Sequence, residues 1–254
     1  MNIFLDDFVE IFFTGLLPFL RISALLVAAP LVSLQVVSVR IRAVLAFTLT
    51  VVVFPQLELP VIDPLSAGGL MLILGEILVG LIFATVLIVV NAALVTAGQS
   101  MSMSMGLGMA QTVDPNAGQV PVLSSFLLVM STLIFLAIGG HLMLFQLILE
   151  SFKAIPLGSD LNIAVISLRV AYWGGMVFLG AVLVAIPLML SMLLVNLCIG
   201  VITRAAPALN IFAVGFPAMI IVGYVLLLIY LVNVGTRVEW LWLEAFQQTQ
   251  TIWD

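Results

Sequence analysis

Long apolar runs, separated by short polar or proline- and glycine-containing breaks, make up most of the chain. Six runs can be delimited, at residues 8–29, 43–54, 65–97, 122–149, 163–202 and 211–234. A helix rises about 1.5 Å per residue and the hydrocarbon core of a bilayer is about 30 Å thick, so one crossing needs roughly 20 apolar residues. The pattern therefore predicts an all-α membrane protein with about six hydrophobic segments.

The lengths of the runs do not fit six simple crossings. Run 43–54 is shorter than a full span, whereas runs 65–97 and 163–202 are longer. Residues that bend or interrupt helices lie inside the apolar runs, namely Pro18, Gly139, Gly174 and Pro187. Because proline removes a helical hydrogen bond and clashes with the preceding turn, we expect long, kinked helical hairpins. The tail at 236–254 combines tryptophans with charges, which is typical of a membrane interface or a partner surface.

The composition strengthens this interpretation. Hydrophobic residues make up 64% of the chain and charged residues 7%, against roughly a quarter charged in an ordinary soluble domain. The formal net charge is -5 and no basic tract is present, so no nucleic-acid partner is expected. We predict a single integral-membrane domain, residues 1–254, or part of a tightly packed assembly of such proteins.

Residues that carry catalytic or metal chemistry are nearly absent. One histidine, His141, and one cysteine, Cys198, cannot supply a zinc site. Gly106-Leu107-Gly108 lacks the later glycine and lysine of a phosphate-binding loop. We therefore expect no catalytic residues, no metal, no cofactor and no enzymatic activity. His141 follows the glycine pair at 139–140, and we expect it to have a structural, hydrogen-bonded role at a helix break.

Two charges lie inside apolar runs. An ionised side chain at membrane depth is costly, and it usually faces protein or water. For Arg21 two interpretations stay open: a contact inside a pore or an assembly, or an arginine that snorkels or pairs with a carboxylate on a neighbour. Glu76 should be protonated, paired or outside lipid. Gly80 and Ala84 form a small-xxx-small pair that allows close approach of two helices.

The stretch from Gly98 to Pro121 differs from the rest of the chain. Four methionines alternate with serines and meet two glycines, and the turn-forming residues Asp114, Pro115 and Gly118 follow. Clustered methionines are deformable, and irregular backbone at membrane depth must be buried in protein or line a cavity. We predict a loop at about 100–121 that lies outside the bilayer or lines a passage. The methionines could form a deformable seal, or they could be ordinary filler between helices.

Several short motifs, in order along nearly the whole chain, carry a resemblance to a known family. They are Arg40-Ile41-Arg42-Ala43, Gly75-Glu76-Ile77-Leu78-Val79-Gly80, Met105-Gly106-Leu107-Gly108 with Asp114-Pro115, Gly139-Gly140-His141, Ser151-Phe152 with Pro156-Leu157-Gly158, Arg204-Ala205-Ala206-Pro207 with Leu209-Asn210, and Gly215-Phe216-Pro217. In these motifs the chain resembles the FliR family of flagellar export proteins.

The resemblance implies a role in protein transport. Family members belong to the export gate of type III secretion systems, a hetero-oligomeric, pore-forming assembly in the bacterial inner membrane within the flagellar basal body. The implied partners are the export-gate P and Q subunits and the flagellar B subunit. Unfolded flagellar substrate proteins pass through the centre, and the subunits form kinked helical hairpins.

The resemblance also implies roles for individual residues. A loop matching roughly residues 106–118 acts as a plug in the closed pore. The candidate plug or gating residues are Met101, Met103, Met105, Gly106, Leu107, Gly108, Met109, Asp114, Pro115 and Gly118. The candidate contacts with partner subunits are Arg21, Arg40, Arg42, Glu76, Arg204, Pro207 and Asn210.

Two other functions stay open. A subunit of a secondary transporter would bind a small substrate and show two similar halves. If the chain were a structural scaffold of the assembly, changes in the loop would alter assembly but would not alter leakage.

Overall fold

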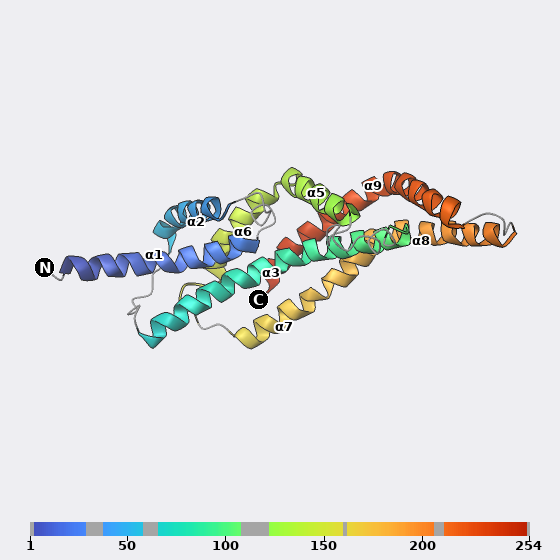
Figure 1. The fold of residues 1–254 in the computed structure, drawn as a ribbon. Helices are drawn as coiled ribbons and strands as arrows, with labels where there is room; N and C mark the ends of the chain where they lie inside the picture. The colour runs from blue at the N-terminus through green and yellow to red at the C-terminus, as the bar shows by residue number, and fades with distance from the viewer. Residues whose placement is uncertain are drawn as a thin grey trace. The chain divides into compact units, whose positions relative to one another are not determined.

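Helices account for nearly all of the chain that the structure, a computed structural model, describes: residues 3–28, 38–57, 66–107, 122–159, 162–205 and 211–252. The elements in chain order are α1 (Ile3–Ala28), α2 (Val39–Val53), the short 3-10 helix η1 (Phe54–Gln56), α3 (Ala67–Ser104), α5 (Val122–Ala137), α6 (Gly140–Ala154), α7 (Ile163–Gly174), α8 (Met176–Ala205) and α9 (Ile211–Thr251) (Figure 1). These ranges contain no strand. The predicted all-α class is confirmed.

Several helices are long and apolar enough to cross a membrane. Within the described ranges there are four such segments, at 39–56, 67–104, 164–205 and 215–251. A fifth is obtained when α5 and α6, which meet at an angle of 71°, are taken as one broken span. In α1 the apolar part, Gly15–Val27, is shorter. The predicted count of about six was therefore loose, although the class of membrane protein is the expected one.

The bend between α5 and α6 lies where the glycine pair predicted a break. Gly139 has φ +75°, a conformation that glycine adopts far more easily than other residues. By contrast, α8 continues through Pro187, and α1 through Pro18. The expected hydrogen bond of His141 is not found at Nδ1, which is buried without a partner among the described residues.

The contacts of the chain fall into two compact units, each assembled from separated segments. Unit 1 comprises residues 1–89, 139–174 and 244–254, and unit 2 comprises 90–138 and 175–243. Both α3 and α9 contribute residues to each unit. A single domain spanning 1–254 stays a prediction.

In unit 1, α1 packs with the first half of α3 and with α6. Buried residues from α1 include Ile22, Leu25 and Leu26, and those from α3 include Val79 and Phe83. The indole of Trp173 in α7 donates to the carbonyl of Val86 at 3.0 Å. Because α3 is apolar on all sides, helices can bury it from several directions.

In unit 2, α9 continues as a regular helix through the residues where the sequence predicted a separate tail to begin. Helix α9 runs on to Thr251, and Trp242 is fully buried. The Trp242 indole donates to Ser131 Oγ at 2.9 Å and meets the ring of Phe135 edge-on, with 4.9 Å between centroids. The expectation that the tryptophans of 236–254 face a membrane interface or a partner is therefore wrong for Trp242.

Candidate functional site

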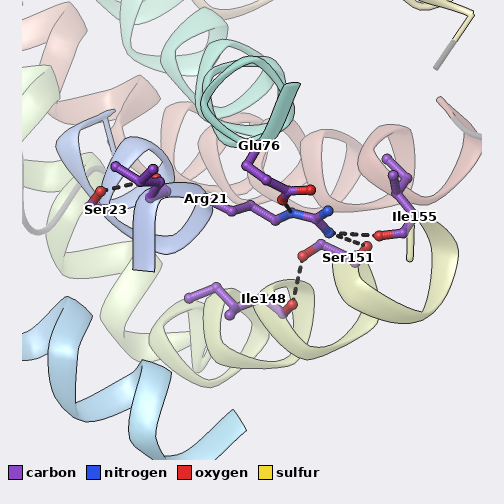
Figure 2. A network of polar contacts seen from close by, with 7 residues as sticks. Arg21, Ser23, Glu76, Ile148, Ser151 and Ile155 are labelled. Carbon is purple, nitrogen blue, oxygen red and sulfur yellow. Dashed lines mark hydrogen bonds and ion pairs between the residues drawn. The ribbon is translucent and has the colours of Figure 1, made fainter. Parts of the chain in front are cut away.

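A buried ion pair lies in unit 1. Arg21 Nε of α1 donates to Glu76 Oε2 of α3 at 2.6 Å, and the two side chains are 1% and 5% exposed (Figure 2). Charged side chains are almost never buried to this extent unless they are paired. The pair therefore satisfies two charges that lie inside apolar helices.

The same guanidinium also closes the end of α6. Arg21 Nη1 donates to the carbonyl oxygens of Ser151 and Ile155 at 2.9 and 2.8 Å (Figure 2). The last carbonyls of a helix lack partners within the helix and carry a partial negative charge, so a cation is well placed there. The Phe152 ring lies 4.5 Å from the Arg21 Cζ atom, a distance typical of a cation–π contact. One side chain thus links α1, α3 and α6.

A glycine in α3, Gly80, allows α1 to approach α3 closely enough for Arg21 to reach Glu76. Gly80 lies one turn after Glu76, on the same face of α3. A Cβ atom at Gly80 would lie only 2.4 Å from the carbonyl oxygen of Arg21 and 2.7 Å from Cβ of Ala24. The two backbones are therefore in direct contact, as the small-residue pair at Gly80 and Ala84 predicted.

The ion pair decides between the two interpretations of Arg21. The arginine pairs with a carboxylate, and the carboxylate belongs to the same chain. This leaves almost no surface on Arg21 or Glu76 for the predicted contact with another subunit. The roles of the Ser151 and Ile155 carbonyls could not be predicted, because backbone carbonyls are common to all residues.

A second candidate region lies in unit 2, where α3 ends. Helix α3 extends through Ser104, and a turn follows in which the Leu107 amide donates to the Ser102 carbonyl at 2.9 Å. The first residues of the predicted loop at 100–121 are therefore helical, which corrects its beginning. Five predicted plug residues lie outside the described residues: Gly108, Met109, Asp114, Pro115 and Gly118.

The described methionines of this region differ in exposure. Met101 and Met105 are fully buried, whereas Met103 is 66% exposed. Met105 packs against α9, since a Cβ atom at Gly223 would lie 2.6 Å from its Cε atom. In this structure Met101 and Met105 occupy a helix–helix seam, and Met103 faces outward. Gly106 and Leu107 are half-buried, and Gly106 has φ +81°, a conformation that favours glycine.

Helices α3 and α5, on either side of residues 108–121, are fastened together. Ser124 Oγ in the first turn of α5 donates to the Val95 carbonyl of α3 at 2.9 Å. A Cβ atom at Gly98 would lie 2.5 Å from Cα of Ser124. The backbones of α3 and α5 thus touch at Gly98 and Ser124, which holds these two helices together within unit 2.

The close contacts at Gly98 and Gly223 can be compared by substitution. Gly98→Ala is expected to destabilise the chain by about 1–3 kcal/mol, because the new methyl group would meet rigid backbone. Gly223→Ala should cost less, because the unbranched Met105 side chain can move away. Gly200→Ala is the matched control, since nothing lies within 4 Å of that position. Unfolding of the purified chain in mild detergent measures the three values, and equal stability of the Gly98 and Gly200 variants would contradict the assignment.

Three of the remaining predicted contact residues, all arginines, lie at helix ends. Arg40 is exposed and Arg42 is half-buried in the first turn of α2, and Arg204 is exposed in the last turn of α8. Pro207 and Asn210 lie outside the described residues. The exposed arginines remain free to take part in the predicted contacts, which stay predictions.

Taken together, the membrane-length apolar helices and a buried ion pair that joins three helices define an integral membrane protein of the all-α class. Residues 12–245 match the family described as bacterial export proteins, family 1. The chain therefore belongs to that family.

Individual relatives give a consistent picture. The chain is 33% identical over 230 residues to the flagellar biosynthetic protein FliR of Pectobacterium carotovorum subsp. carotovorum, a match that covers 90% of this chain and 88% of the relative. It is 32% identical to the protein of the same name from Escherichia coli K12, with the same coverage. Identity to that of Bacillus subtilis 168 is 30%, covering 89% and 88% of the two chains.

Proposed function

We propose that this chain is a subunit of the bacterial flagellar protein export apparatus in the inner membrane, and that it helps to form and close the channel for unfolded flagellar proteins. The family match over residues 12–245 and the flagellar relatives support membership of the apparatus. The membrane-length helices support the inner-membrane location in the basal body.

The observation that carries the closing role is the contact between the helices on either side of residues 108–121. Ser124 and Gly98 fasten α5 to α3, so the helices before and after the proposed plug are held to each other. Its neighbours Met103, Gly106 and Leu107 are exposed or half-buried. A loop between two such helices that contains deformable methionine and permissive glycine suits a seal that yields to a passing chain.

The proposed partners are other membrane subunits of the apparatus: the export-gate P and Q subunits and the flagellar B subunit. Exposed apolar side chains are numerous on α8 and α9, among them Phe178, Leu194, Leu197, Val201, Leu228 and Val232. A surface of this kind needs lipid or neighbouring protein to cover it. The proposed role is structural and transport-related rather than catalytic.

Secretion of flagellar subunits tests the proposed function. In the bacterium that carries this chain, its deletion is expected to abolish secretion of flagellin, and expression from a plasmid should restore it. Membrane levels of an unrelated transporter serve as the control for general damage. Normal secretion in the deletion strain would contradict the proposal, and loss of uptake of a small solute would instead indicate a secondary transporter.

A further inference from the structure

An apolar groove lies between α1 and α2 in unit 1. Its volume is about 440 Å³, and it is lined by Gly15, Leu16, Phe19, Phe47, Thr50, Val51 and Phe54. The hydroxyl of Thr50 donates to the Ala46 carbonyl at 2.8 Å, so it offers no proton to a ligand. Gly15 leaves the floor open, because a Cβ atom there would be 3.9 Å from the nearest atom, in Phe54. The groove is thus suited to an apolar chain.

A single stripe of α2 connects this groove to a positive charge. Arg40, Val44, Phe47 and Val51 of α2, and Phe54 at the start of η1, follow one another at steps of three or four residues, which places them on one helical face. Val44, Phe47 and Val51 are 65%, 63% and 56% exposed, and Arg40 is exposed. The face therefore has a cation at one end and apolar side chains along the rest.

The length of the stripe matches one leaflet of a bilayer. The 14 residue-to-residue steps from Arg40 to Phe54 span about 21 Å at the rise of an α-helix. Half of a bilayer, with its headgroup region, is also about 21 Å thick. A lipid whose phosphate lies at Arg40 would therefore place the end of its acyl chain in the groove near Phe54.

We propose that the groove between α1 and α2 binds one anionic phospholipid, with its headgroup at Arg40 and an acyl chain along the stripe to Phe54. Charge complementarity favours an anionic headgroup, because the only charged residues of α2 are Arg40 and Arg42. The acidic residues of α1 (Asp6, Asp7 and Glu10) lie in its first turns, beyond Gly15 and so away from the arginine end. Guanidinium groups bind phosphate through paired hydrogen bonds.

Arg42 lies on a different face of α2. It is half-buried, on the side of Ala46 and Val53, which are buried, and it makes an interaction of its own within the chain. The headgroup site is therefore assigned to Arg40, and Arg42 adds only to the local positive potential. The proposal depends on the membrane location of the chain and not on its closing a channel.

Native mass spectrometry of the purified full-length chain tests this assignment. The chain is released from a mild detergent that contains phosphatidylglycerol and phosphatidylcholine in equal amounts. The wild type is expected to retain phosphatidylglycerol in preference. Arg40→Gln should reduce that preference roughly fivefold, the contribution of one basic residue near an anionic surface. Gly15→Leu, which fills the groove, should reduce retention of both lipids.

Two matched variants serve as controls. Arg237→Gln removes an exposed charge from α9, and Gly15→Ala adds a methyl group that fits without a clash; both should behave as the wild type. If Gly15→Leu fails to give a folded, monodisperse chain, Val51→Asn replaces it, because Val51 lines the groove and is exposed. Equal retention of the two lipids by the wild type would overturn the proposal. The proposal would also be overturned if the Arg40→Gln and Arg237→Gln variants showed the same preference for phosphatidylglycerol. It would equally be overturned if the groove cross-linked to another protein chain and retained no lipid.

Discussion

Replacing Arg21 with methionine is expected to destabilise the folded chain by about 3–5 kcal/mol, the usual cost of removing one member of a buried ion pair. The substitution leaves the Glu76 carboxylate without its partner, and it also removes both hydrogen bonds to the end of α6. Arg21→Lys should recover only part of this loss, because an ammonium group cannot reach a carboxylate and two carbonyls with the fixed geometry of a guanidinium. The measurement is the free energy of unfolding of the full-length chain in a mild detergent.

A double-mutant cycle separates the ion pair from simple loss of packing. Glu76→Met leaves the arginine charge buried, whereas Arg21→Met with Glu76→Met removes both charges. The double variant should be less destabilised than the sum of the single variants by about 2 kcal/mol, because contacting residues couple. The free energy of unfolding of the double variant should still be lower than that of the wild type, because the carbonyls of Ser151 and Ile155 no longer accept hydrogen bonds from Arg21. Arg237→Met, at an exposed position, is the control, and strictly additive effects would show that the two charges do not interact.

Gly80→Ala is the second substitution with a large expected effect. Alanine is normally the better helix former by about 0.5–1 kcal/mol, but here its methyl group would lie 2.4 Å from the backbone of Arg21. A backbone atom cannot move aside as a flexible side chain can. Helix α1 must shift, and Arg21 then moves relative to Glu76. We expect a loss at the upper end of the range for overpacking, about 3 kcal/mol.

Gly75 provides the matched control on the same helix. No atom lies within 4 Å of a Cβ built there, so Gly75→Ala should leave stability unchanged or raise it slightly. The same unfolding measurement applies to both variants. If they had equal stability, the close contact between α1 and α3 at Gly80 would be disproved.

The sequence predicted the helical membrane class because that class depends on composition and run length, which are properties of the sequence itself. It also predicted the break at Gly139 and the close approach at Gly80, since each depends on a residue with an unusual conformation or size. A carboxylate partner for Arg21 and a paired state for Glu76 were each among the stated options, but neither partner was named. What could not be predicted was that both partners belong to this chain, because 55 residues separate them.

The ends of helices were predicted less well, for an identifiable reason. The apolar runs were delimited by hydrophobicity, so the serines after Gly98 were interpreted as the start of a loop. Met101 and Met105 are four residues apart and both buried, which is the spacing of one helical face. The same spacing occurs at the end of α9, where Val238, Trp242 and Ala245 are buried. Helical periodicity, rather than apolar content, would have extended both helices.

Some features of the candidate sites could be predicted from the sequence and others could not. Arg21 and Glu76 were found from the sequence because charges inside apolar runs are conspicuous. The contacts of Gly98 with Ser124 and of Gly223 with Met105 were missed, because they depend on which helices pack together. A pairing of helices is set by tertiary packing, and no short pattern in this chain specifies it.

The proposed function requires that residues 106–118, after α3, close a channel. Permeability of the inner membrane to a small solute tests it most directly, in cells that express this chain and the proposed export-gate subunits, with residues 106–118 present or deleted. We expect the deletion variant to leak while the complex still purifies intact, since Gly98 and Ser124 hold α3 and α5 together outside the deleted residues. If the complex is intact and the membrane remains impermeable, these residues do not close the channel, and the buried methionines are packing alone.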